Sequence, residues 1–174
     1  MGHVVGIPTK YGGIQFRSRL EAKWASFFDT LGWEYEYEPF DLAGWIPDFA
    51  LMLRNKVLVE VKPSLDVEEL SRHSDKIDRA EPSNEVLLVG ATPFMDDHVI
   101  GLFWDGMEWS EAESFRCVTG HGLGWCHSTG SFMCRVCGEY DGDHHKHPIS
   151  DAYMSTLREQ WAIASNISQW RGRP

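Results

Sequence analysis

The sequence lacks the features that place a protein in or across a membrane. No apolar run approaches the roughly 18 residues of a membrane-spanning helix, and the first residues show no basic region followed by an apolar segment. A cytoplasmic location is therefore expected. Basic residues are also in the minority, because 16 Lys and Arg face 26 Asp and Glu and the net charge is −10. Such a chain does not hold nucleic acid through its overall charge, although a local basic groove remains compatible with it.

Repeats, low-complexity segments and abundant cysteine are absent as well. The four cysteines all lie between residues 117 and 137, and in a reducing compartment they are metal ligands or thiols rather than disulfides. Apolar residues, in contrast, are plentiful: 43% of the chain is hydrophobic and 13% aromatic, with eight tryptophans. At 174 residues, this composition predicts one packed domain of ordinary size with a small appendage.

Hydrophobic periodicity predicts an α/β fold with a mixed sheet. Two of the strands are joined at Arg54–Asn55 by a connection so short that they must form an antiparallel hairpin, and a second hairpin is expected to turn at Asp105–Gly106. The expected elements are a helix over 18–31, strands over 33–40, 46–53 and 56–62, a helix over 64–80, a strand over 85–92, a hairpin over 99–109 and a closing helix over 150–170.

Charged residues interrupt the first predicted hairpin where burial is expected. Pro47–Asp48 begins one strand, and Glu60 and Lys62 end the other. Strand alternation places Glu60 and Lys62 on one face, and a hairpin centred near Arg54 places Asp48 roughly opposite Glu60. Two adjacent carboxylates repel each other unless a cation neutralises them, and a hard divalent ion such as Mg²⁺ suits such a site. An interstrand salt bridge between Lys62 and either carboxylate is the simpler alternative.

Glu21 is a third acidic candidate with two interpretations. Ser18-x-x-Glu21 spells a capping box, in which the glutamate caps its own helix. Glu21 also lies beside Leu20 and Trp24, toward the apolar stripe that must face the sheet. A role in the metal site is favoured over capping alone, and the two roles do not exclude each other.

These residues together resemble the PD-(D/E)XK nuclease superfamily, the fold of type II restriction enzymes and archaeal Holliday-junction resolvases. The resemblance lies in residues 16–63, where "FRSRLEAKWASFFDTLG" is followed by "PD" at Pro47–Asp48 and by "EVK" at 60–62. By element order it extends over about the first 110 residues. It implies a restriction-endonuclease-like core: a helix, a three-stranded antiparallel meander, a second helix and a strand.

The resemblance also implies an activity, that of a Mg²⁺-dependent deoxyribonuclease that hydrolyses phosphodiester bonds. Asp48, Glu60 and the Val61 carbonyl would bind Mg²⁺ or Mn²⁺. Lys62 would act on the attacking water, and Glu21 would be the additional first-helix acid that many members use. DNA is the implied partner, and selection of branched or junction DNA would suit the acidic net charge. A homodimer or a protein partner is compatible with this family, as is a bacterial cell or a phage-infected host.

The segment after residue 115 is rich in Cys, His and Gly and poor in aliphatic residues. Two motifs, "CVTGHG" and "CRVCG", each place a pair of ligands before a glycine, which is the form of a zinc knuckle. A closed site of four ligands would be structural rather than catalytic. The preferred Zn²⁺ ligands are Cys117, His121, Cys134 and Cys137. In the rival set, Cys126 replaces His121.

These motifs give the expected domain organisation. Residues 1–113 form the nuclease-like core, 114–147 a zinc-binding ribbon that turns at Thr129–Gly130, and 148–174 a C-terminal helix that packs on the core. His144, His145 and His147 are interpreted as part of a solvated polar loop, with a second metal site as the alternative. The alternative function is a non-catalytic adaptor that binds nucleic acid or protein through the zinc ribbon.

Overall fold

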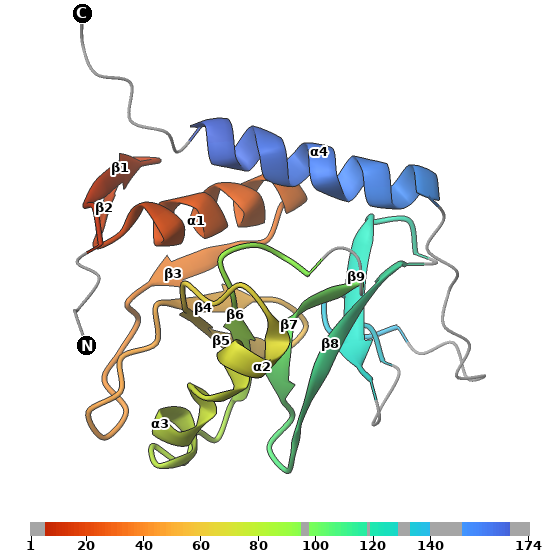
Figure 1. Cartoon of the computed structure of the whole chain (residues 1–174). Helices are drawn as coiled ribbons and strands as arrows, with labels where there is room; N and C mark the ends of the chain where they lie inside the picture. Colours follow the sequence, from red (N-terminus) through yellow and green to blue (C-terminus); the bar gives the residue numbers. More distant parts are fainter. Residues whose placement is uncertain (1–5, 95–97, 118, 129–132, 140–150, 168–174) are drawn as a thin grey trace, which may run out of the picture.

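The computed structural model describes residues 6–94, 98–117, 119–128, 133–139 and 151–167. A seven-stranded sheet, in the order β3-β4-β5-β6-β7-β8-β9, forms its centre, and helices α1 and α4 lie together along one side of it (Figure 1). The mixed α/β class predicted from the sequence is confirmed. The helices are α1 (Arg19–Leu31), α2 (Val67–Ser71), α3 (Ser74–Asp78) and α4 (Asp151–Ile167). The strands are β1 (Thr9–Tyr11), β2 (Ile14–Phe16), β3 (Tyr35–Tyr37), β4 (Phe49–Met52), β5 (Lys56–Val61), β6 (Glu85–Val89), β7 (Val99–Trp104), β8 (Trp109–Arg116) and β9 (Leu123–His127).

Helix α1 begins and ends as its sequence predicts. The Ser18 hydroxyl accepts the backbone N–H of Glu21 at 3.1 Å, which satisfies one of the free donors of the first turn. At the other end, Gly32 adopts the left-handed conformation (φ 69°) that most residues avoid. Between these caps, α1 buries an aromatic face that includes Trp24 and Phe28 against the sheet and α4. The ring centroids of Trp24 and Trp161 of α4 are 4.8 Å apart.

The sheet is mixed, with a single parallel pair among its described strands. Strands β3, β4 and β5 form an antiparallel meander, and β6 pairs with β5 in parallel after the crossover through α2 and α3. The remaining neighbours are antiparallel. One core lies between the sheet and α1 and α4, and a second core, which contains Leu70 of α2 and Ile77 of α3, lies on the opposite face.

The helix expected over 64–80 is wrong as a single element. The structure has two short helices, α2 and α3, with the chain turning between them at Arg72 and His73. Leu65, an apolar residue within the expected helix, is 79% exposed. The segment is therefore anchored by Leu70 and Ile77, and these two contacts do not require one continuous helical face.

Strand β9 does not form a ribbon separate from the core. It pairs with β8 and is the last strand of the central sheet, with Leu123 and Trp125 buried in the same core as α1. A boundary at 113/114 therefore cuts through β8 rather than between two sheets. The turn expected at Thr129–Gly130 and the three histidines at 144, 145 and 147 lie outside the described residues. Of the helices described, none has the length and apolarity needed to cross a bilayer.

Candidate functional site

The acidic residues of the predicted hairpin lie opposite each other at one end of β4 and β5. Phe49 pairs with Val59, so Asp48 stands across from Glu60, one position further along. Ala50 and Leu58 pack in the core that contains α2 and α3, and alternation puts Asp48 and Glu60 on that same face. The residues are only 5% and 4% exposed. The hairpin thus buries two carboxylates side by side, as expected from a turn centred near Arg54.

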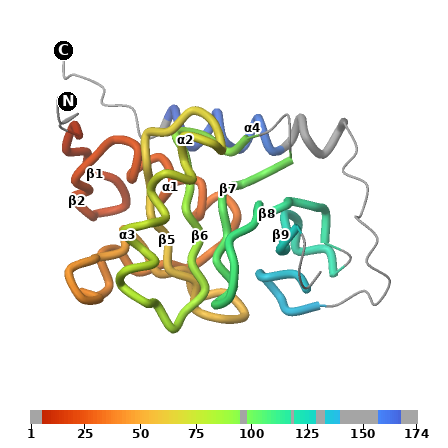
Figure 2. The backbone as a smooth tube through the Cα atoms, turned by 60° about the horizontal axis from the view of Figure 1, so that its bottom comes forward, coloured from red at the N-terminus to blue at the C-terminus, as the bar shows by residue number. Residues whose placement is uncertain are grey.

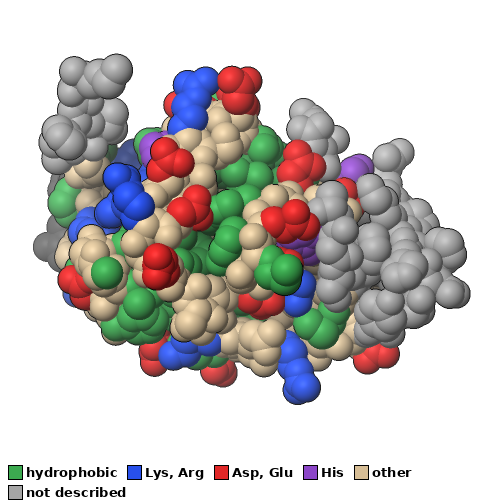
Figure 3. All heavy atoms as spheres, turned by 90° about the horizontal axis from the view of Figure 1, so that it is seen from below, with side chains coloured by type: hydrophobic (Ala, Val, Ile, Leu, Met, Phe, Trp, Pro, Cys, Tyr) green, Lys and Arg blue, Asp and Glu red, His purple; other side chains and the backbone are tan. Residues whose placement is uncertain are grey.

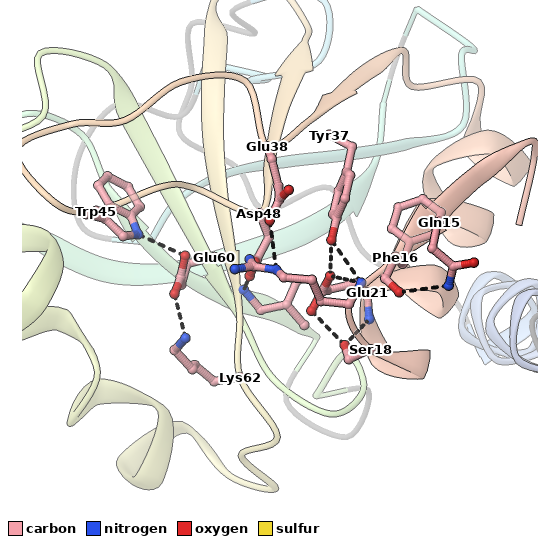
Figure 4. Close-up of polar contacts among 12 residues, drawn as sticks. Gln15, Phe16, Ser18, Glu21, Tyr37, Glu38, Trp45, Asp48, Glu60 and Lys62 are labelled. Atoms are coloured by element: carbon pink, nitrogen blue, oxygen red, sulfur yellow. Dashed lines mark hydrogen bonds and ion pairs between the residues drawn. The ribbon is translucent and has the colours of Figure 1, made fainter. Parts of the chain in front are cut away.

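Each of the four carboxylate oxygens has a donor (Figure 4). For Asp48, Oδ2 accepts the backbone N–H of Val61 at 2.8 Å, and Oδ1 accepts the guanidinium of Arg17 at 2.6 Å. For Glu60, Oε2 accepts the Trp45 indole N–H at 2.8 Å, and Oε1 accepts Lys62 Nζ at 2.5 Å. Arg17 and Lys62 therefore each supply one positive charge to the acidic pair.

Burial and the neighbouring carboxylate change the ionisation of Asp48. Burial, followed by the negative charge of Glu60, raises the pKa of Asp48 to about 7, although the Val61 N–H and Lys62 oppose this shift. A carboxyl group ordinarily ionises near pH 4, so the site disfavours the ionised form of Asp48, and a bound cation would favour that form.

Glu21 is buried near the pair but is held by its own neighbours. Its Oε1 accepts the Ser18 hydroxyl at 2.8 Å, and its Oε2 accepts the Tyr37 hydroxyl at 2.6 Å and the Arg17 N–H at 3.2 Å. Burial and the bond to Glu21 raise the pKa of Tyr37 to about 12, so this phenol stays a donor. Glu21 thus takes part in capping α1, and it belongs to no shared metal cluster with Asp48 and Glu60 among the described residues.

Sequence reasoning missed Arg17, Tyr37 and Trp45 as parts of this site. Trp45 is placed by a tight turn in which Leu42 and Trp45 exchange backbone hydrogen bonds of 2.7 and 2.8 Å. The turn needs positive φ at its two central residues, and Gly44 supplies one of them (φ 89°). An Ala-Gly pair just before the PD motif was the available signal. For Arg17, the signal was its position directly before the helix cap.

A cleft of about 400 Å³ opens beside the acidic pair. Its walls come from the segment that enters α1 and from the end of β5, so it runs between Glu21 and Lys62. The cations Arg17, Arg19 and Lys62 line it. An anionic ligand in this cleft would meet these three cations, two of which, Arg17 and Lys62, also bind the acidic pair.

The Cys/His segment forms a compact cluster of four metal-ligand side chains. The ligand atoms of Cys117, His121, Cys134 and Cys137 all lie within 4.8 Å of one another. Cys117 Sγ is 3.6 Å from Cys137 Sγ, and Cys134 Sγ is 3.5 Å from His121 Nε2. Among the described residues, this is the one such group of three or more side chains. It could hold zinc as a closed Cys₃His site.

Cys126 is not part of the cluster. It lies on β9 opposite Glu113, and the structure therefore assembles the preferred ligand set rather than the all-cysteine set. Gly124, two residues before Cys126, leaves room for the Cys134 thiol, because a Cβ atom at position 124 would lie 2.9 Å from Cys134 Sγ. Burial, together with the neighbouring Cys117 thiol, raises the pKa of Cys134 to about 12. A metal ion would favour the thiolate form.

The second knuckle, residues 134–138, is bound to the central sheet beside β9 (Figure 2). The Arg135 N–H donates to the Trp125 carbonyl at 2.9 Å, and its buried guanidinium pairs with Glu85 of β6 at 3.0 Å. The Arg54 N–H, in the turn between β4 and β5, donates to the Val136 carbonyl at 3.1 Å. The knuckle therefore contacts the turn of the hairpin that carries Asp48 and Glu60.

Comparison with models of protein families, with curated proteins and with solved structures found no match to this chain.

The acidic pair offers a suitable donor set for a hard divalent ion. The buried carboxylates of Asp48, directly before β4, and of Glu60 on β5 could supply oxygen ligands, and Val61 lies between Glu60 and Lys62 at the wall of the cleft. The ion pairs of Arg17 and Lys62 meet the same need for positive charge that such an ion would meet. An Mg²⁺ or Mn²⁺ ion would have to displace at least one of them.

Proposed function

We propose that the chain is a metal-dependent DNA endonuclease that hydrolyses phosphodiester bonds. One observation carries the proposal: Asp48, directly before β4, and Glu60 of β5 are buried side by side, with Lys62 bound to Glu60 at the wall of a cleft. The order of helix, antiparallel meander, crossover helices and parallel strand supports it, because it is the order of a restriction-endonuclease-like core. The resemblance of residues 16–63 to the PD-(D/E)XK superfamily assigns the roles.

The proposed roles are metal binding, activation of water and positioning of the cleft. Asp48, Glu60 and the Val61 carbonyl would hold Mg²⁺ or Mn²⁺, and the ion would supply a more acidic bound water and positive charge for the phosphate. Lys62, whose Nζ lies 2.5 Å from Glu60, would orient the attacking water or stabilise the charge that develops on the phosphate. Glu21 keeps the start of α1, and with it Arg17, in place beside the cleft.

The charge distribution favours a local contact with DNA. Acidic side chains are spread over the face seen in Figure 3, and the net charge of the chain is −10. The cations Arg17, Arg19 and Lys62, in contrast, gather in the cleft. A site of this kind suits a DNA structure that can present one phosphate to a narrow cleft, such as a branch or junction, better than a long straight duplex.

The decisive experiment measures cleavage of plasmid, single-stranded and branched DNA in Mg²⁺ or Mn²⁺ by the wild type and by Lys62→Ala. The expected rate loss is about two to four orders of magnitude, which is usual for a lost acid–base or electrostatic group. Metal binding measured by calorimetry should survive or tighten, because a competing cation is removed. Lys56→Ala is the matched control, since Lys56 is an exposed lysine at the other end of the same strand. Equal rates for wild type and Lys62→Ala would reject the assignment.

A second function, that of a non-catalytic adaptor, is favoured by one observation. All four oxygens of Asp48 and Glu60 already have protein donors, so the site is also complete as a structural network. An adaptor would bind DNA or protein with Asp48→Asn and Glu60→Gln as well as wild type does, and would cut no DNA in any metal.

A further inference from the structure

Arg17 is an exposed cation that pairs with the buried carboxylate of Asp48. Its guanidinium lies 2.6 Å from Asp48 Oδ1 and, through Nε, 2.8 Å from Glu38 Oε1. The Arg17 side chain is 57% exposed, whereas that of Asp48 is only 7% exposed. The guanidinium approaches Asp48 from the solvent side. Because this guanidinium is exposed to water, the ion pair is weaker than a fully buried one.

The backbone of Arg17 is fixed while its side chain is long. Its N–H donates to Glu21 Oε2 at 3.2 Å and to the Tyr37 hydroxyl at 3.0 Å, between buried Phe16 and the helix cap Ser18. Arg17 also lines the cleft together with Lys62. Rotation about its side-chain bonds can therefore move the guanidinium from Asp48 into the cleft without a change in the backbone.

Arg17 occupies the oxygen of Asp48 that a metal ion would need. Oδ2 accepts the Val61 N–H inside the hairpin, so Oδ1 is the oxygen turned toward solvent-exposed groups. A divalent ion bound to Oδ1 would take the place of the guanidinium. The two cations therefore compete at this atom, because each is repelled by the positive charge of the other.

We propose that Arg17 competes with the divalent ion for Asp48 and, once displaced, binds a phosphate group of the nucleic acid in the adjoining cleft. This inference rests on the proposed function and adds to it an order of events: the phosphate-binding cation becomes free only when the ion is in place. A planar guanidinium with paired N–H donors matches phosphate oxygens well, and the cleft contains Arg19 and Lys62 as further cations.

The competition is tested by titrating Mn²⁺ alone, followed by electron paramagnetic resonance, into wild type, Arg17→Gln and Arg19→Gln. Arg19 is the matched control, because it lines the same cleft and its Nε has no hydrogen-bond partner among the described residues. Both substitutions remove one positive charge, but only Arg17→Gln frees Asp48. We expect the Asp48-dependent Mn²⁺ site, defined by its loss in Asp48→Asn, to bind roughly tenfold more tightly in Arg17→Gln than in Arg19→Gln.

The binding of phosphate by displaced Arg17 is tested with a short branched DNA in Ca²⁺, which replaces Mg²⁺ so that binding can be measured without cleavage. Arg17→Gln should weaken DNA binding in Ca²⁺ by roughly tenfold and leave the weaker binding without added divalent ion unchanged. A loss of equal size with and without Ca²⁺ would overturn the ordered release. If Arg17→Gln does not fold, Arg17→Lys replaces it: an ammonium lacks the separate, planar donors with which Arg17 holds Glu38 through Nε and Asp48 through a terminal nitrogen, so Mn²⁺ should still bind more tightly than in wild type.

The outcomes separate this inference from the nuclease function. Equal Mn²⁺ affinity of Arg17→Gln and Arg19→Gln, in a wild-type protein that cuts DNA, overturns the inference alone. Absence of an Asp48-dependent Mn²⁺ site overturns both. Absence of cleavage with an Arg17-specific gain in Mn²⁺ affinity rejects the nuclease and supports the competition.

Discussion

The donors around Asp48 and Glu60 determine, one residue at a time, what the acidic pair can do. The opposition of the two carboxylates could be predicted, because strand alternation and a short hairpin fix it from local sequence alone. Their donors could not. Arg17 reaches Asp48 across 31 positions of sequence and Trp45 reaches Glu60 across 15, so both contacts depend on how separate elements pack.

The charge of Asp48 should cost stability as the pH rises. Its pKa is raised by burial and by Glu60 to about 7, so the folded protein holds a proton that the unfolded chain releases near pH 4. Stability from this group is therefore greatest in acid and is lost as the pH rises toward 7. Asp48→Asn keeps an oxygen for the Val61 N–H but has no charge. In metal-free protein it should be about 1–3 kcal/mol more stable than wild type at pH 8 and equal to it near pH 4, as measured by urea unfolding. A pH-independent difference would contradict this account.

The indole of Trp45 should be worth more to stability than that of an exposed tryptophan. Trp45→Phe removes the N–H that satisfies Glu60 Oε2 and leaves a buried carboxylate oxygen without a donor. We expect a loss of about 1–3 kcal/mol in the free energy of unfolding. Trp109→Phe is the control, because its indole bonds to exposed Asp78. If Trp45→Phe costs the same in a Glu60→Gln background, lost packing rather than the hydrogen bond explains the effect.

Helices and strands were predictable where several local signals agreed. Helix α1 has a cap, an aromatic stripe and a terminal glycine, and all three agree with the structure. The 64–80 segment has no such agreement, because its weak periodicity does not show where the chain breaks into α2 and α3. The place of β9 in the main sheet was not predictable either. Its abundant Gly, Cys and His concealed the two residues, Leu123 and Trp125, that bury it.

The geometry of the Cys/His cluster predicts which residues bind zinc. Zinc content measured by mass spectrometry should be about one per chain in wild type and in Cys126→Ser, and should be strongly reduced in Cys134→Ser. The reason is that Cys134 lies in the four-residue cluster, whereas Cys126 lies on β9 outside it. Zinc loss in Cys126→Ser together with tolerance of His121→Ala would show that the ligand set is all-cysteine.

The molecule as a whole should depend on the metal, because the knuckles are attached to the central sheet. Arg135 pairs with Glu85 and Arg54 bonds to Val136, so disorder in the knuckle would release contacts of β6 and of the β4–β5 turn. Removal of zinc with a strong chelator should lower the melting temperature by on the order of 10 °C in a single transition.

The control for zinc removal is Cys134→Ser, whose melting temperature should be low already and insensitive to the chelator. Two separate transitions, with the larger one unchanged by the chelator, would instead show an independent zinc unit.

The strands of the central sheet stand in the same order in space as in the chain, from β3 to β9. Each strand can therefore pair with its predecessor as synthesis proceeds, and most of the sheet forms through contacts that are close in sequence, which favours rapid folding. Helix α4 is the exception. The Trp161 ring that covers Trp24 and Phe27 of α1 leaves the ribosome only after the whole sheet has done so. Until then a nascent chain exposes an aromatic surface to chaperones and proteases, so a product truncated before residue 151 should be cleared rather than accumulate.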